Sequence, residues 1–360
     1  MFNNIYKGKT VLLTGHTGFK GSWLALWLHE MGAKVIGFSK DFPSEPTHFQ
    51  LLNLDITSII GDIRDLKHLK SVFEEYQPDI VFHLAAQALV RYSYNEPIET
   101  FETNVMGTVN VYECALQTSS VKAFVNITSD KAYENKEWVW GYKENDPMGG
   151  HDPYSASKGC AELVTSSYRN SFFQHTDKLL ASARAGNVIG GGDWALDRLV
   201  PDIFKATSKS ETVIIRNINA TRPWQHVLEP LSGYLLLGQL LLEKNSKAAE
   251  GWNFGPNDDD TRAVGNVIEN IQKHWSEVKF EVIQDKNQPH EANLLKLDCS
   301  KALAYLQWKP VWHFDQTIEY TTNWYKDYYN NKNLNVAERS KADLYKYIED
   351  AKNKGLKWTR

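Results

Sequence analysis

The chain contains little cysteine, little net charge and no long hydrophobic run. Its three cysteines, among 360 residues, lie far apart, so neither a disulfide framework nor a zinc-binding spacing is indicated. The formal charge is −4, and no run of one sign indicates a nucleic-acid or membrane surface. The most apolar later stretch, residues 231–242, falls well short of the roughly 20 residues of a spanning helix. The first ten residues are also too polar for a signal peptide, so we expect a cytoplasmic protein. Because no zinc-binding spacing is present, we also expect no metal site.

Short apolar runs alternate with helix-like segments in the first half of the chain. The runs are residues 10–13, 34–38, 79–84 and 123–128, and the helix-like segments include residues 22–31, 65–76 and 104–116. Unbroken apolar runs between helices are typical of parallel strands that are buried on both faces. The pattern predicts an α/β fold, a Rossmann-type doubly wound parallel sheet followed by a smaller α/β C-terminal substrate domain.

Three glycines, Gly15, Gly18 and Gly21, separate the first predicted strand from the first predicted helix. Glycines allow a tight turn and let backbone N–H groups approach a pyrophosphate at the positive end of a helix. The spacing is Gly-x-x-Gly-x-x-Gly, which differs from the usual Gly-x-Gly-x-x-Gly dinucleotide fingerprint. The strand before and the helix after it nevertheless favour a dinucleotide-binding loop over a merely structural turn.

The residues leave the choice between NAD and NADP open. An acid near the end of the second strand usually holds the ribose hydroxyls of NAD. Here that place reads Ser39-Lys40-Asp41, so the acid comes late and the lysine is able to meet a 2′-phosphate. Asp62, followed by Ile63, is expected either beside the adenine or as the N-cap of the next helix.

Polar residues that suit acid–base chemistry follow the fourth predicted strand and begin a later helix. Tyr154 and Lys158 are one helical turn apart on the same face, and a nearby lysine cation favours the phenolate, so Tyr154 can act as a base. Ser129, Asp130 and Lys131 come directly after the strand, where ligands gather in a doubly wound sheet. These three form either an acid–base set with Tyr154 or a solvated turn with a local Asp–Lys ion pair.

Several longer stretches make the sequence resemble a known family. It is similar to the extended short-chain dehydrogenases/reductases, and within them to the sugar-nucleotide 4,6-dehydratases, from Val11 to about Trp324. Most of these dehydratases have Thr-Asp-Glu where this chain has Ser129-Asp130-Lys131. The lysine resembles the branch that acts on CDP-glucose, which carries Thr-Asp-Lys, and Ser129 keeps the hydroxyl. The stretches at residues 15–23, 135–138 and 190–194 resemble the same branch.

The resemblance implies NAD as the cofactor and assigns its binding to residues of the first half. These are Gly15, Thr17, Gly18, Phe19, Gly21, Ser39, Asp62, Ile63, Ala85, Ala86, Tyr154 and Lys158.

The chemistry that the resemblance implies is a dehydration by internal redox. Tyr154, with Lys158, takes the proton of the 4-hydroxyl of CDP-glucose while a hydride passes from carbon 4 to NAD, and Ser129 shares the hydrogen bond. Asp130 protonates the departing 6-hydroxyl, and the hydride returns to carbon 6. The base at carbon 5 is either Lys131 or Asp130 with water. A lysine must be neutral to accept that proton, and its ordinary pKa is about 10.4, so burial or a cation must lower it. We favour Lys131.

Five residues of the second half are candidates for the nucleotide sugar. Arginine forks suit a diphosphate because two planar N–H groups meet two oxygens, although surface ion pairs are an alternative. The candidates, most of them implied by the resemblance, are Asn187, Arg198, Arg216, Arg222 and His290.

The domain organisation follows from a change of character after Gly186. We predict an NAD-binding domain at residues 1–186, a nucleotide-sugar-binding domain at 187–330 and a helical tail at 331–360, expected to be a solvated helix. The resemblance implies that segments near 224–258 fold back onto the first domain. It also implies a homo-oligomer, dimer or tetramer, and a product used for dideoxysugars of bacterial lipopolysaccharide. Alternatives are another sugar-nucleotide dehydratase or 4-epimerase, an NADP-linked reductase, or a non-catalytic NAD-binding protein.

Overall fold

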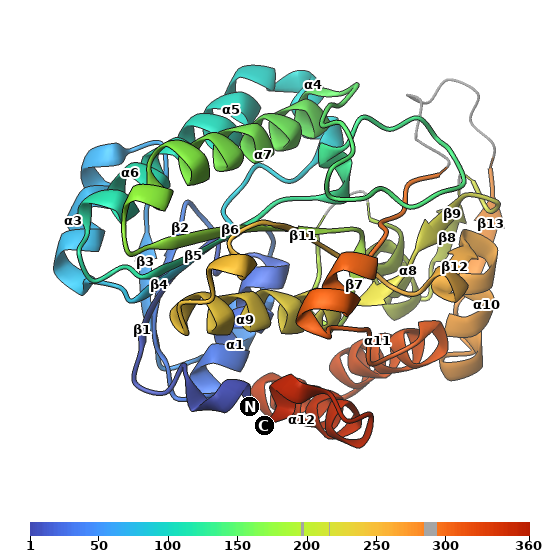
Figure 1. Cartoon of the computed structure of the whole chain (residues 1–360). Helices are drawn as coiled ribbons and strands as arrows, with labels where there is room; N and C mark the ends of the chain where they lie inside the picture. Colours follow the sequence, from blue (N-terminus) through green and yellow to red (C-terminus); the bar gives the residue numbers. More distant parts are fainter. Residues whose placement is uncertain (196–197, 216, 284–293) are drawn as a thin grey trace.

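The computed structural model describes residues 1–195, 198–215, 217–283 and 294–360. Its centre is a sheet of seven parallel strands in the spatial order β11-β6-β5-β4-β1-β2-β3 (Figure 1). The strands are β1 (Thr10–Thr14), β2 (Lys34–Ser39), β3 (Thr57–Ile60), β4 (Ile80–His83), β5 (Ala123–Ile127), β6 (Leu179–Ala185) and β11 (Gly251–Phe254). The four apolar runs form β1, β2, β4 and β5, and the predicted fold class is confirmed.

Helices cover both faces of this sheet. The α-helices are α1 (Phe19–Glu30), α2 (His48–Leu52), α3 (Leu66–Tyr76), α4 (Val90–Asn95), α5 (Pro97–Phe101), α6 (Thr108–Gln117), α7 (Pro153–Ser171), α8 (Leu199–Ser208), α9 (Leu228–Leu242), α10 (Val264–His274), α11 (Phe314–Asn330) and α12 (Val336–Asn353). In Figure 1, α3, α6 and α7 lie over one face, and α1, α9 and α12 lie over the other. Within the described parts of the chain, no helix has the length and apolar character to cross a membrane.

The strands are apolar throughout because each face needs its own buried side chains. On β1, Val11 and Leu13 belong to the core shared with α1 and α9, whereas Leu12 belongs to the core shared with α3 and α6. On β5, Val125 and Phe124 divide in the same way. Alternate residues of a strand point to opposite faces, so a sheet covered on both sides requires an unbroken apolar run.

The second half of the chain forms small sheets beside the main one. In this part β7 (Val188–Ile189) pairs with β10 (Gln225–His226), β9 (Thr221–Pro223) with β12 (Thr261–Ala263), and β8 (Thr212–Ile215) with β13 (Lys279–Val282). They share an aromatic core that includes Trp194, Phe204, Trp275 and Trp324. The last strand of the main sheet, β11, also comes from this half and pairs with β6. The division at residue 186 stays a prediction.

The C-terminal helix α12 is not the solvated helix that the sequence suggested. Leu344 and Tyr347 are fully buried in the core beneath α1 and α9. The two chain ends meet beside α12 (Figure 1), where Phe2 stacks on Trp358 with ring centroids 5.2 Å apart. The lysine-rich positions of this helix face the solvent, but its apolar stripe completes the core on the face of the sheet that α1 and α9 cover.

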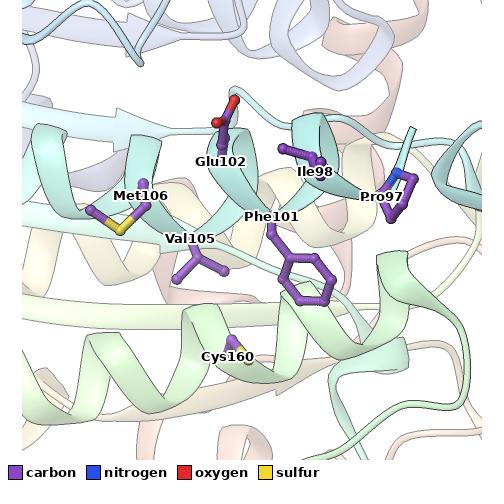
Figure 2. A pocket seen from close by; sticks show the side chains of 7 residues that line it. All are labelled: Pro97, Ile98, Phe101, Glu102, Val105, Met106 and Cys160. Carbon is purple, nitrogen blue, oxygen red and sulfur yellow. The ribbon is translucent and has the colours of Figure 1, made fainter.

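A shallow apolar groove lies between α5, the π-helical turn η2 (Glu102–Gly107) and α7 (Figure 2). Its lining residues are Pro97, Ile98, Phe101, Glu102, Val105, Met106 and Cys160. The side chain of Ile98 is 73% exposed, and that of Leu163 on α7 is 60% exposed. Apolar residues grouped on one face in this way mark an interaction surface more often than scattered ones do.

The buried carboxylate of Glu229 joins three parts of the fold. One oxygen accepts a hydrogen bond from the Trp312 backbone N–H (2.7 Å), and the other accepts from the Val311 N–H (2.9 Å) and the Tyr347 hydroxyl (2.8 Å). Burial raises the pKa of Glu229 to about 7, although these hydrogen bonds oppose the rise. The side chain thus ties α9 to the segment before α11 and to α12.

The pKa of Glu229 predicts a specific pH dependence of stability. Because the folded pKa is raised from about 4.5 to about 7, this carboxyl contributes less stability as the pH rises through that window. The loss amounts to about 3 kcal/mol. Glu229→Gln removes the titration and places an NH₂ donor against backbone N–H groups, which lowers stability by about 1–3 kcal/mol.

Urea unfolding of both proteins at about pH 5 and about pH 8 measures the effect. The stability advantage of the wild type over Glu229→Gln should shrink between the two pH values. An advantage that is the same at both would contradict the raised pKa.

Candidate active site

The turn between β1 and α1 has the form of an anion-binding loop. Gly15 has a φ of +77°, and a Cβ added to it would lie 2.7 Å from the backbone nitrogen of Ala85, directly beyond β4. A Cβ on Gly21 would lie 2.0 Å from the Gly15 oxygen, so neither position accepts a larger residue. The first turn of α1 has neither a capping side chain nor an acid. Its N–H groups therefore suit the pyrophosphate of a dinucleotide.

Side-chain hydrogen bonds hold this loop against the end of β2. The Thr17 hydroxyl donates to the Asp41 carbonyl (2.7 Å), and the Thr17 N–H donates to Ser39 Oγ (3.3 Å). Ser39 also shares a hydrogen bond with Nδ1 of His16 (2.8 Å). Burial lowers the pKa of His16 to about 4, so this residue, which the sequence analysis did not single out, is a neutral structural link.

The basic residues near the predicted ribose site are paired with carboxylates. Lys40 Nζ lies 2.6 Å from Glu99 of α5, and Arg64 lies 2.7 Å from Asp62 and 3.6 Å from Glu99. Asp65, not Asp62, is the N-cap of α3, so the helix-cap alternative for Asp62 is wrong. Glu99 could not be foreseen from the sequence, because it approaches Lys40 from an element 59 residues later.

The remaining predicted cofactor positions of the first 86 residues lie on this side of the sheet. Ile63 is buried, and a Cβ on Gly107 would meet its Cδ1 at 2.5 Å. Ala86 follows Ala85 beyond β4, while Phe19 opens α1 directly after Gly18. The predicted cofactor residues of the first 86 positions therefore border the carboxyl ends of β1, β2, β3 and β4, the edge at which doubly wound sheets bind ligands.

The five predicted catalytic residues come together beyond the end of β5. Ser129 caps the short helix η3 (Asp130–Ala132): its Oγ accepts from the Lys131 N–H (3.2 Å) and donates to Asp130 Oδ1 (2.9 Å). Tyr154 lies in the first turn of α7, with Lys158 one turn later. The Lys131 ammonium lies 5.9 Å from the centroid of the Tyr154 ring.

Burial dominates the proton affinities in this cluster. It raises the pKa of Tyr154 to about 12, while a hydrogen bond from Ser129 and the charge of Arg198 act to lower it. The sequence analysis expected Lys158 to lower this pKa, but desolvation of the phenolate is the larger effect in this structure. Burial also raises the pKa of Asp130, against the opposing charges of Lys131 and Lys20.

Lys158 lies one helical turn before Glu162, which forms a buried ion pair with Arg184. Burial lowers its pKa to about 8, and the charge of Glu162, one turn further along α7, opposes that change. Glu162 lies 2.8 Å from Arg184 of β6 and accepts hydrogen bonds from the hydroxyls of Thr128 and Ser182. Burial acts to raise the Glu162 pKa, but Arg184 and these hydroxyls lower it overall. Glu162 and Arg184 were not foreseen from the sequence.

Three of the five substrate candidates are described. Asn187 is exposed just after β6. Arg198 pairs with Asp193 at 3.0 Å, and its charge reaches both Tyr154 and Lys20. Arg222 lies on β9. The predicted candidates Arg216 and His290 lie outside the described residues.

Arg222 has a partner that the sequence analysis missed. In the β9–β12 ladder it stands directly opposite Arg262, and Arg262 also lies over the Phe314 ring at 5.8 Å. Like charges on opposite positions destabilise a two-stranded ladder, so the pair suits a bound anion. Pro223 of the same strand and the Asp130 carboxylate both approach Gly186, which brings this ladder near the catalytic cluster.

Comparison with known proteins agrees with this geometry. Residues 12–321 match the family model described as GDP-mannose 4,6 dehydratase. The chain is 51% identical to the CDP-glucose 4,6-dehydratase of Salmonella typhimurium, over 95% of this chain and 97% of that protein.

Solved structures show the same fold. An epimerase from Methanothermobacter thermautotrophicus has a TM-score of 0.78 at 25% identity, covering 91% of this chain and 96% of its own. The dTDP-glucose 4,6-dehydratase of Bacillus anthracis, solved in complex with NAD, has a TM-score of 0.74 at 20% identity, covering 90% and 98%. The resemblance to sugar-nucleotide 4,6-dehydratases is thereby confirmed, and the chain belongs to the GDP-mannose 4,6-dehydratase family.

Proposed function

We propose that this protein is a CDP-glucose 4,6-dehydratase, which converts CDP-D-glucose to CDP-4-keto-6-deoxy-D-glucose and water. The observation that carries the proposal is the 51% identity, over nearly the whole chain, to a protein of that name. The third residue of Ser129-Asp130-Lys131 and the acid–base cluster around it support the same substrate branch. A 4-epimerase of this fold would need Tyr154 and Lys158 but has no use for an acid beside carbon 6.

The cofactor of this reaction is NAD. When bound, it supplies an acceptor for the hydride of carbon 4 and returns that hydride to carbon 6. The glycine turn at the uncapped start of α1 fits its pyrophosphate. Glu99 and Asp62 neutralise Lys40 and Arg64, so the carboxylates favour ribose hydroxyls over a 2′-phosphate and thus NAD over NADP.

Tyr154 acts on the 4-hydroxyl of the sugar, and Asp130 acts on its 6-hydroxyl. Tyr154 accepts the proton of the 4-hydroxyl; burial raises its pKa, and the Ser129 hydrogen bond and the Arg198 charge oppose that rise. Asp130 is an acid because burial raises its pKa. It gives a proton to the 6-hydroxyl as the bond from carbon 6 to oxygen breaks, and water leaves.

Lys131 is the proposed base at carbon 5. It follows Asp130 on η3 and reaches over the Tyr154 ring, so one short helix presents both an acid and a base to the sugar. Removal of the carbon 5 proton supplies the electron pair for the double bond between carbons 5 and 6. The alternative is that Lys131 stays charged beside the enolate while Asp130 or water takes the proton.

The reaction is tested by incubating the protein with CDP-glucose in heavy water, with NAD or NADP supplied. We expect NAD to support loss of one water with gain of one deuterium at carbon 5, without net reduction of the cofactor. Mass spectrometry of the product and absorbance of the cofactor measure both results.

Each other outcome has a distinct meaning. Activity only with dTDP- or GDP-sugars would place the protein in another dehydratase branch, and net consumption of a reduced cofactor would indicate a reductase. Binding of NAD without conversion of any of these sugars would indicate a non-catalytic protein.

Lys131→Met tests the assignment of the base. Without a proton acceptor at carbon 5, elimination should slow by a factor on the order of 10² to 10⁴, while CDP-glucose still binds. Rate measurements compare this variant with Lys136→Met, which alters a lysine of the neighbouring loop that lies over Trp138. Full elimination by Lys131→Met would assign the proton to Asp130 or water.

We further propose that two copies associate through the apolar groove between α5, η2 and α7. A twofold axis beside these helices would bury Ile98 and Leu163 of both copies, since a self-complementary face needs only one patch. A dimer of such dimers would give a tetramer. The proposed setting is the cytoplasm, and the product would serve dideoxysugars of a bacterial lipopolysaccharide.

Leu163→Lys should convert the dimer to a monomer, because the lysine charge would be buried at the interface. Light scattering measures the mass of the particle in solution. The control is Leu303→Lys, which changes a leucine that is 54% exposed on the short helix η7 (Ala302–Leu306) and should remain dimeric. A dimer that persists in Leu163→Lys would locate the interface elsewhere, and a monomeric wild type would rule the association out.

A further inference from the structure

Serine side chains bind the main chain of Tyr154 at both its N–H and its C=O. The N–H donates a hydrogen bond to Oγ of Ser93 on α4 (3.1 Å), and the C=O accepts one from Oγ of Ser157 on α7 (2.7 Å). Both serines are fully buried, so the two hydroxyls meet protein atoms and not solvent. The backbone of the residue that carries the phenol is therefore fixed by side chains on either side of its Cα.

Ser93 completes the start of α7, where the helix itself provides no partner for Tyr154. The first N–H groups of a helix lack partners within it. The capping residue Asp152 accepts from the Ser155 N–H (2.9 Å), and Pro153 has no N–H. Because a buried N–H without a partner is strongly disfavoured, the hydroxyl of Ser93, 61 residues earlier in the chain, holds this first turn in place.

Ser157 is bound in turn to the segment that contains Ser93. Its Oγ accepts from Nδ2 of Asn104 on η2 (2.8 Å). The same amide of Asn104 pairs with the backbone of Gln87: it accepts from the Gln87 N–H (2.8 Å) and donates to the Gln87 C=O (3.0 Å). Residues 84–95 thus reach the N–H of Tyr154 through Ser93 and its C=O through Asn104 and Ser157.

The other end of segment 84–95 lies against the glycine turn. The N–H groups of Leu84 and Ala85 donate to Oγ1 of Thr14 (3.2 and 3.1 Å). A Cβ added to Gly15 would lie 2.7 Å from the Ala85 nitrogen. One segment therefore contacts both the turn that suits a pyrophosphate and the first turn of the helix that carries Tyr154.

We infer that Ser93 and Ser157 are positioning residues for the oxidation of carbon 4, acting through the main chain of Tyr154. The inference rests on the proposed dehydratase function. In that step the proton of the 4-hydroxyl goes to Tyr154 while the hydride of the same carbon leaves for the cofactor. The tyrosine and the cofactor-binding turn must therefore keep a fixed spacing, which segment 84–95 sets. A displacement of about 1 Å from such a geometry slows a reaction by a factor on the order of 10².

The experiment compares Ser93→Ala and Ser157→Ala with the wild type, each loaded with NAD and mixed rapidly with CDP-6-deoxyglucose. This analogue has a 4-hydroxyl to oxidise but no 6-hydroxyl to lose, so reduced nicotinamide should remain on the protein. Its near-ultraviolet absorbance then reports the oxidation of carbon 4 alone, as a rate constant and an amplitude. Bound NAD is measured before mixing.

Thr118→Val is the matched control. It removes a buried hydroxyl that donates to the Cys114 carbonyl (2.8 Å). Thr118 lies between α6 and the start of β5, at the edge of the sheet opposite to the site. This variant should keep the rate constant of the wild type.

Each serine variant should lower the rate constant by a factor on the order of 10 to 10². The amplitude, the bound NAD and the analogue concentration that gives half the maximal rate should stay unchanged, because the binding groups remain. A merely structural role would instead lower the amplitude, which counts the active molecules, and leave their rate constant as it is.

Three outcomes would overturn the inference. Rate constants equal to that of the wild type in both serine variants would show that these contacts do not position Tyr154. A loss confined to the amplitude would make the contacts structural only, and a loss of bound NAD would assign them to cofactor binding. A wild type that converts neither CDP-glucose nor the analogue would refute the proposed function itself.

Discussion

The buried pair of Glu162 and Arg184 supports the centre of this molecule. The two side chains are 3% and 6% exposed and lie 2.8 Å apart. Glu162 accepts hydrogen bonds from the hydroxyls of Thr128, directly after β5, and of Ser182 on β6. Arg184 donates to the Tyr133 hydroxyl, which in turn donates to Asn253 of β11. Removing one partner of such a pair leaves an uncompensated charge in the interior. The pair therefore fixes α7, and with it Tyr154 and Lys158, relative to the ends of three strands.

The low polarity of the interior around Glu162 and Arg184 also shifts the pKa values of the titratable groups of the active site. The same burial that raises the pKa values of Tyr154 and Asp130 lowers those of Lys158 and Lys20. Desolvation disfavours the charged form of acids and bases alike, so the pKa values of the two lysines move toward neutrality, whereas the pKa of Tyr154 moves further above it. A bound sugar nucleotide or dinucleotide would change these surroundings, and with them the proton affinities of the four groups.

The second half of the chain is tied to the first at several levels. β11 extends the main sheet, Glu229 of α9 holds the segment before α11, and α12 covers the lower layer. Through these links the ladder that carries Arg222 and Arg262 is held near Asp130. The contact region of two such parts is a common position for a small-molecule ligand.

The amino-acid sequence by itself determined the features that have a local period or a local turn. The apolar runs predicted β1, β2, β4 and β5, the glycines predicted the turn into α1, and helical spacing placed Lys158 on the same face as Tyr154. The position of Ser129-Asp130-Lys131 directly after a strand was enough to expect it at the ligand-binding edge of the sheet.

Only the tertiary structure decided the contacts between residues far apart in the chain. Glu99 meets Lys40, Arg262 faces Arg222, and Arg184 meets Glu162, although no repeat or spacing in the sequence relates these pairs. The buried stripe of α12 was misjudged because a helix with many lysines looks solvated until the surface that covers its apolar side is known. The pKa of Tyr154 differs from the expectation for the same reason, since desolvation depends on what the whole chain packs around the hydroxyl.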